Sequence, residues 1–182
     1  MKATGIVRRI DDLGRVVVPK EIRRTLRIRE GDPLEIFTDR EGEIILKKYS
    51  PIGELSQFAG QYAESLAQAV GCLVCITDRD HVIASAGTGK KDYDARQISR
   101  FLEEAISSRE NILARKGEKE FIKITVDDEG GYTSQAICTI ICEGDAIGSV
   151  VLCGKDEKNA VGETEFKLAK VAAGFLGRQM EQ

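Results

Sequence analysis

The chain of 182 residues contains no tryptophan and one histidine, and aromatic residues make up only 5% of it. Few side chains are therefore available to stack on bases or sugars. The lone His81 follows a turn at 78–80, and nothing in the sequence supports a Ser–His–Asp or Cys–His–Asn arrangement around it. No run of about 18 apolar residues occurs, so a membrane span is not expected. We expect a cytoplasmic protein that is not an enzyme and needs no cofactor.

The sequence also lacks the cysteine pattern of a secreted protein, because its five cysteines are odd in number and lie in apolar runs. Cys72 and Cys75 have the spacing of a metal or redox pair, and Cys138 and Cys142 could complete four ligands. In a strand, however, residues three apart point to opposite faces, so the four thiols should not converge. Reduced core cysteines without a metal are the favoured interpretation, and metal or redox sensing is the alternative.

Basic residues are slightly outnumbered overall, since the net charge is −3, but they are concentrated near the N-terminus. Residues 1–50 hold 12 Lys and Arg against 9 Asp and Glu, a net +3, which leaves −6 for residues 51–182. Within residues 1–29, 9 basic residues against 3 acidic ones give +6. A small basic module joined to an acidic body indicates that the N-terminal part faces a polyanion.

The first 50 residues predict a domain of hairpins and one helix. Short alternating or β-branched runs are expected to form strands at 4–10, 15–18, 34–37 and 43–46. The turn between the first two strands is expected at 11–14, and Pro19 favours the start of a short helix. A domain of about 50 residues buries too little apolar surface to be stable alone. This domain is therefore expected to self-associate.

Beyond a linker expected at 49–53, residues 54–182 predict a second domain that mixes helices and strands. Strands are expected at 73–77, 82–85, 121–125, 134–141 and 147–153, and helices at 54–70, at 95–107 and near the C-terminus. This order is typical of an α+β domain in which helices cover an antiparallel sheet.

The first and last of these helices carry apolar seams with steps of three and four residues. The seams consist of Leu55, Ala59, Tyr62, Leu66 and Ala69, and of Phe166, Ala169, Ala173, Leu176 and Met180. Such spacing places the side chains on one helix face, which suits either core packing or an interface between chains. We favour an intermolecular helix bundle that joins dimers into a homotetramer.

The segments GRVVVPKEIRRTL at 14–26 and GDPLEI at 31–36 carry a resemblance to a known family. Residues 2–48 resemble the AbrB family of DNA-binding domains, whose swapped-hairpin fold is also similar to the MazE antitoxins. With the segment AAGFLGRQM at 172–180, the whole chain is similar to AbrB-type regulators of spore-forming bacteria that carry a GAF-like domain. The resemblance implies a β-rich dimeric module, in which two chains exchange hairpins, followed by an α+β GAF-like domain.

The family pattern implies which residues contact double-stranded DNA. The expected contacts are Arg8, Arg15, Arg23 and Arg24, with Arg9, Lys2 and Lys47 as weaker candidates. Guanidinium groups suit phosphates and guanine edges, and each phosphate that is neutralised releases counterions. The alternative is a solvated basic face without a ligand.

The resemblance implies a sequence-tolerant regulator that activates and represses sporulation genes and lies on the nucleoid of the forespore. One alternative is a small-molecule or redox sensor with an unknown effector, for which DNA binding is the output. The cyclic-nucleotide signature of some GAF domains is missing, so no ligand residue can be assigned. The other alternative is an antitoxin-like module, against which the patterned residues 51–182 argue.

Overall fold

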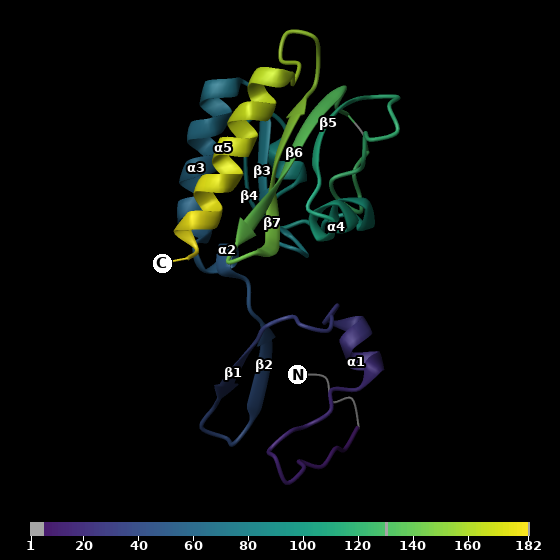
Figure 1. The fold of residues 1–182 in the computed structure, drawn as a ribbon, viewed down its shortest axis with the longest axis vertical. Helices are drawn as coiled ribbons and strands as arrows, with labels where there is room; N and C mark the ends of the chain where they lie inside the picture. Colours follow the sequence, from purple (N-terminus) through teal and green to yellow (C-terminus); the bar gives the residue numbers. More distant parts are fainter. Residues whose placement is uncertain (1–5, 130, 182) are drawn as a thin grey trace. The chain divides into compact units, whose positions relative to one another are not determined.

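The computed structural model describes residues 6–129 and 131–181, and the chain divides into two compact units, Met1–Tyr49 and Ser50–Gln182. Figure 1 shows the elements of each unit. Among the described residues, no helix combines the length and the apolar character that a bilayer crossing requires.

The first unit contains one short helix and one two-stranded sheet. Its elements are α1 (Lys20–Thr25), β1 (Leu34–Thr38) and β2 (Ile44–Lys48). Pro19 precedes α1 with a φ of −56°, which suits the start of a helix. The antiparallel register places Ile36 opposite Leu46, so the predicted second hairpin is confirmed.

The first predicted hairpin forms its turn but not its strands. The backbone N–H of Gly14 donates to the Asp11 carbonyl at 3.0 Å, and that of Asp11 donates to the Arg15 carbonyl at 3.0 Å. The described residues on either side, 6–10 and 15–18, are not strands. Val7 and Val17 are 87% and 71% exposed, so within one chain these runs have neither a neighbouring strand nor a core to pack against.

The second unit is built on a five-stranded antiparallel sheet with the strand order β4-β3-β7-β6-β5. The strands are β3 (Leu73–Thr77), β4 (Val82–Ala86), β5 (Asn111–Arg115), β6 (Ser134–Cys142) and β7 (Asp145–Gly154). The helices are α2 (Pro51–Glu54), α3 (Ser56–Val70), α4 (Arg100–Ser107) and α5 (Glu163–Gln179), with a 3-10 turn η1 (Lys90–Asp92). Helices α3 and α5 lie on one face of the sheet and α4 on the other (Figure 1).

The sheet separates two apolar cores. Because strand side chains alternate, Val74 and Ile76 pack with α3 and α5, whereas Leu73 and Cys75 pack on the α4 side. Ala173 on α5 is only 3% exposed and belongs to the first of these cores.

The seam residues of the last helix therefore face the sheet of their own chain. Ala169 and Leu176 are fully buried in the same core as Ala173. The favoured interpretation of this seam as an intermolecular interface is wrong for these three residues. Helix α5 lies so close to β6 that a Cβ atom at Gly177 would collide with the Ile141 carbonyl.

Three local predictions in the second unit are wrong. The segment 121–125 is not a strand and makes only an isolated bridge between Thr125 and Ile98, while the unpredicted β5 pairs with β6. Helix α4 begins at Arg100 and not at the predicted residue 95, because the Ser99 hydroxyl accepts from the Leu102 N–H at 3.1 Å and caps the helix there. The expected linker at 49–53 overlaps α2, which Ser50 caps in the same way.

Candidate nucleic-acid interface

The arginines that the sequence singles out lie in three segments of the first unit. Arg8 and Arg9 belong to the irregular segment before the turn, Arg15 ends the turn, and Arg23 and Arg24 lie on α1. All five are exposed. Among the described residues, no ion pair joins the arginines of the turn to those of α1. Lys2 lies outside the residues that the structure describes.

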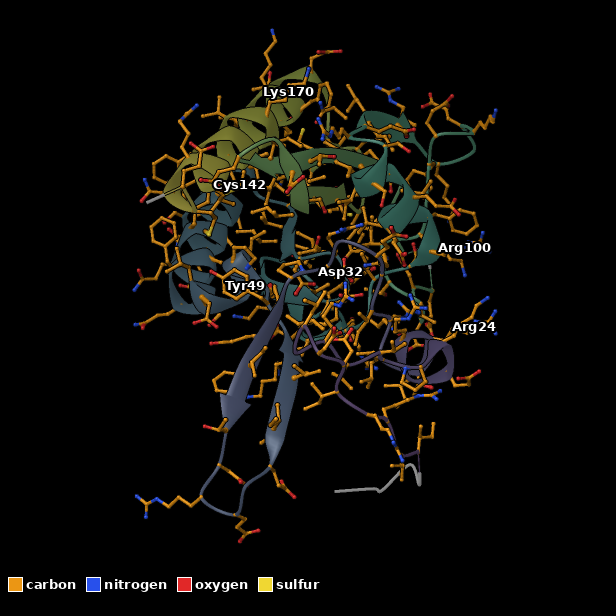
Figure 2. All side chains as sticks on the ribbon, turned by 60° about the horizontal axis from the view of Figure 1, so that its bottom comes forward. Arg24, Asp32, Tyr49, Arg100, Cys142 and Lys170 are labelled. Carbon is orange, nitrogen blue, oxygen red and sulfur yellow. The ribbon has the colours of Figure 1, made fainter. Side chains whose placement is uncertain are left out.

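Helix α1 presents its basic residues without burying any side chain. Arg23 and Arg24 occupy its last turn, where the partial negative charge of a helix C-terminus favours basic side chains. The Arg24 side chain extends away from the helix (Figure 2). A helix of 6 residues is not stable by itself, so contacts at its ends must hold it in place.

The C-terminal end of α1 is fastened to β2 by a buried carboxylate. The Asp32 side chain is 4% exposed, and its Oδ2 accepts from the Arg29 N–H at 2.8 Å and lies 3.4 Å from Lys48 Nζ. Lys48 Nζ also donates to the carbonyl of Arg27 at 2.9 Å. Arg27 has a φ of +52°, a conformation that costs energy for a side chain other than glycine. Asp32 and Lys48 therefore hold the residue at which the chain leaves α1.

The turn before Val16 is closed by another carboxylate. Asp11 Oδ1 accepts from the backbone N–H groups of Leu13 at 3.0 Å and Arg15 at 2.8 Å. Its Oδ2 accepts from Arg15 Nε at 2.8 Å. The Arg15 N–H and then the Arg15 side chain are the main reasons why the pKa of Asp11 lies below its ordinary value. Sequence reasoning assigned Asp11 to a turn and missed its contact with an expected DNA ligand.

Lys47 lies in a different environment from the arginines. It is on β2 directly opposite Glu35, and its Nζ lies 4.9 Å from the centre of the Phe37 ring. The exposed Lys47 side chain therefore lies over a ring of its own sheet. The structure therefore does not group Lys47 with α1 or with the turn.

The other face of the hairpin is apolar and uncovered. Ile36 and Leu46 face each other across the two strands, with Ile44 beside them. These three side chains are 67%, 37% and 66% exposed, respectively. We call Ile36, Ile44 and Leu46 the hairpin face. Exposed apolar patches of this kind are typical of interaction surfaces.

The cysteines of the second unit are free and buried. Cys72 and Cys138 lie on the α3 side of the sheet, whereas Cys75 and Cys153 lie on the α4 side. Burial raises the pKa of Cys72 to about 11 and that of Cys138 to about 12. Within the described residues, no cluster of three or more side chains has the arrangement of a metal site. Because the thiolate is the reactive form, these thiols are poor redox sensors in the folded protein.

Sequence reasoning missed a polar cluster on the α4 side of the sheet. The Tyr93 hydroxyl donates to Asp128 Oδ1 at 3.0 Å, and Asp128 Oδ2 accepts from the Ile124 N–H at 3.1 Å. The Tyr132 hydroxyl donates to the Thr88 carbonyl at 3.3 Å, and the two tyrosine rings lie 5.8 Å apart. Burial raises the pKa of both tyrosines. The cluster joins loops far apart in sequence, so no periodic pattern indicates it.

The outer sides of α3 and α5 carry a second uncovered apolar surface. Phe58 and Tyr62 of α3 pack with Phe175 of α5, with ring centres 5.5–6.3 Å apart. Leu168 and Val171 on α5 are 38% and 65% exposed. We call these five residues the outer helix face. Leu168, Val171 and Phe175 lie beside the buried seam of α5 rather than on it, whereas Tyr62 is a partly buried member of the predicted α3 seam.

Two family models match the chain. The model for "Stage V sporulation protein T C-terminal, transcription factor" covers residues 54–181, and the model for "Antidote-toxin recognition MazE, bacterial antitoxin" covers residues 7–54. In Bacillus subtilis (strain 168), the transition state regulatory protein AbrB is 67% identical over 51 residues, which are 28% of this chain and 52% of AbrB. The predicted AbrB-type character of the N-terminal part is therefore confirmed.

The second unit has the predicted GAF-like fold. The cofactor-binding GAF domain of the nutrient sensor CodY from Clostridium difficile matches with a TM-score of 0.52 at 14% identity, over 71% of this chain and 92% of that one. At this identity the match concerns the fold alone. Stage V sporulation protein T of Bacillus subtilis (strain 168) is 54% identical over 182 residues, the full length of both chains. The chain belongs to the stage V sporulation protein T family of transcription factors.

Proposed function

We propose that this protein is a DNA-binding regulator that activates and represses sporulation genes on the nucleoid of the forespore. Its contacts with double-stranded DNA come from Arg8, Arg15, Arg23 and Arg24, with Arg9, Lys2 and Lys47 in weaker roles. The observation that carries the proposal is the exposed pair Arg23 and Arg24 on a helix that Asp32 fastens in place. The function assigns no catalytic residue and no cofactor.

A second copy of the chain covers the hairpin face in this proposal. Ile36 and Ile44 are each about two-thirds exposed, and the runs around Val7 and Val17 have no strand to pair with. Exchange of hairpins between two chains supplies both the missing strands and the missing core. It also presents every arginine twice, which doubles the number of phosphates that one N-terminal dimer, here called a head, contacts.

The second unit assembles these dimers into a tetramer. Residues 51–182 carry a net charge of −6, which makes contact with phosphates unfavourable. The outer helix face, with Val171 at its most exposed point, is an apolar surface suited to pairing with the same face of another chain. Linking two heads makes the second DNA contact intramolecular and raises avidity by about 10²–10⁴.

A small-molecule sensor with DNA binding as its output is the second candidate. The observation in its favour is the polar cluster of Tyr93, Asp128 and Tyr132 beside α4, in a GAF fold. The redox form of this candidate is disfavoured because all the cysteines are buried and the pKa of Cys72 is raised to about 11. Thermal shift of the full chain against a metabolite panel separates sensor from assembly domain, because a ligand raises the melting temperature.

The arginine assignment is tested with two double variants that remove the same charge. Arg23→Ala with Arg24→Ala should lower the slope of log affinity against log salt by about 0.9 per lost contact, or about 3.6 per dimer. Lys90→Ala with Lys91→Ala serves as the control, because these exposed lysines belong to the second unit. The control should keep the slope of the natural protein. Equal losses in the two double variants would refute the assignment.

A further inference from the structure

We propose that Asp11 is a positioning residue that aims the Arg15 guanidinium at DNA and thereby sets how well the protein distinguishes one DNA sequence from another. This inference rests on the proposed function, in which Arg15 is a DNA contact. Asp11 acts through Arg15 and does not itself bind DNA.

The carboxylate of Asp11 is held from three directions within one turn. Oδ1 accepts from the N–H groups of Leu13 and Arg15, and Oδ2 accepts from Arg15 Nε at 2.8 Å. Backbone hydrogen bonds between Asp11 and Arg15 and between Gly14 and Asp11 close the same turn. Gly14 has a φ of +75°, which a side chain would disfavour. The backbone of the turn therefore fixes the carboxylate end of the contact.

The contact leaves the recognition atoms of Arg15 in solvent. The Arg15 side chain is 70% exposed, and its hydrogen bond to Asp11 uses the Nε–H. The two terminal amino groups are the donors that a guanine edge or a phosphate binds as a pair. Because the side chain is already restrained, less rotamer entropy is lost when those groups bind DNA.

Asp11 also weakens the attraction of Arg15 for phosphates in general. Arg15 Nε lies 2.8 Å from Asp11 Oδ2, so for a phosphate farther away the two opposite charges largely cancel. The Asp11 carboxyl is ionised at neutral pH even at its ordinary pKa, and hydrogen bonds from Arg15 lower that pKa further. Among ion pairs between described residues, none involves Arg23 or Arg24. The α1 arginines therefore supply attraction that does not depend on DNA sequence. Arg15 contributes mainly where its oriented terminal amino groups meet matching acceptors on the DNA.

Asp11→Asn removes the ion pair with Arg15 but keeps the hydrogen bonds that close the turn. Asparagine keeps an Oδ1 that accepts the two backbone N–H groups, but its amide nitrogen cannot accept from Arg15 Nε. Asp12→Asn is the matched control, because it removes the same charge from the neighbouring exposed residue. Among the hydrogen bonds and ion pairs of the described residues, none joins Asp12 to Arg15. Thermal melts of both full-length variants check that folding is unchanged.

The readout is the ratio of two affinities measured with the full chain at one salt concentration. One probe is a duplex that the natural protein has selected from a random pool, and the other is a shuffled duplex of the same length and composition. Asp12→Asn should tighten both complexes by the same factor and leave the ratio unchanged. Asp11→Asn should tighten the shuffled complex similarly but lower the ratio about tenfold, which corresponds to one paired arginine–guanine contact.

The same two substitutions in an Arg15→Ala background complete the test. There Asp11→Asn and Asp12→Asn should give the same ratio, because the residue that Asp11 positions is gone. The proposal is overturned if the two variants behave alike while Arg15 is present, or if the loss of Asp11 still lowers the ratio without Arg15. If Arg15→Ala itself leaves both affinities at natural levels, the arginine assignment fails first, and this inference fails with it.

Discussion

Ile36→Thr should weaken the dimer of the first unit while leaving the single chain almost unaffected. Ile36 is 67% exposed in the hairpin face, so about two-thirds of its surface remains to be buried. Complete burial of such a side chain contributes about 1.5–3 kcal/mol, so Ile36 contributes about 1–2 kcal/mol per chain and about 2–4 kcal/mol per dimer. The dissociation constant of the dimer should therefore rise about 30- to 1,000-fold.

Sedimentation and thermal melts of a fragment of residues 1–50 measure this effect. The melting temperature of the natural fragment should rise with protein concentration, and the Ile36→Thr fragment should need much higher concentrations to melt at the same temperature. Thr38→Ser, on the same strand and the same side of the sheet, removes only one methyl group and should change little. A monomeric fragment whose melting temperature does not depend on concentration would refute the reasoning.

Two further predictions concern the second unit. Val171→Glu puts a charge on the outer helix face and should split tetramers into dimers, weakening binding to long duplexes more than to short ones; a tetramer that persists in sedimentation would exclude this interface. Burial raises the pKa of Cys72 from 9.0 to about 11. The contribution of the neutral Cys72 thiol to the stability of the folded state should therefore be complete below pH 9 and be lost as the pH rises towards 11. Urea unfolding should therefore show a smaller loss of stability in this pH window for Cys72→Ala, and an identical pH profile would contradict the assignment.

Periodicity in the sequence identified the elements that depend on local pattern. The steps of three and four residues through Leu66 and Leu176 correctly indicated α3 and α5, and the apolar runs indicated β3, β6 and β7. The same steps could not show what covers a helix face, because packing on a sheet of the same chain and packing on another chain use the same spacing. Ala173 was therefore assigned to an interface although it lies in the core.

Elements that depend on contacts between distant segments were missed. β5 is an edge strand with the exposed ends Asn111 and Arg115, and its short apolar run does not distinguish a strand from a helix. Phe121 and Ile122 have a more β-like pattern but pack on the α4 core as irregular chain. Contacts between segments that are distant in the sequence determine whether such a run becomes a strand, and a single sequence does not show these contacts.

The candidate site was only half visible in the sequence. The AbrB-type motif indicated the arginines, but Asp11 was predicted only as part of a turn, and no contact was predicted for Asp32. In the structure, Asp11 fixes Arg15, and Asp32 fastens α1 to β2 through Lys48. The pairing of Asp32 with Lys48 joins the loop after α1 to β2, so it needed the fold to become apparent.

The most direct test of the central claim compares the salt dependence of DNA binding by the full chain and by residues 1–50. The probe is a short duplex that accommodates one head, so avidity does not contribute. If all phosphate contacts come from the first unit, both proteins should give the same slope of log affinity against log salt, because that slope counts the phosphates that are neutralised. A clearly shallower slope for the fragment would show that residues 51–182 contact DNA and would contradict the account.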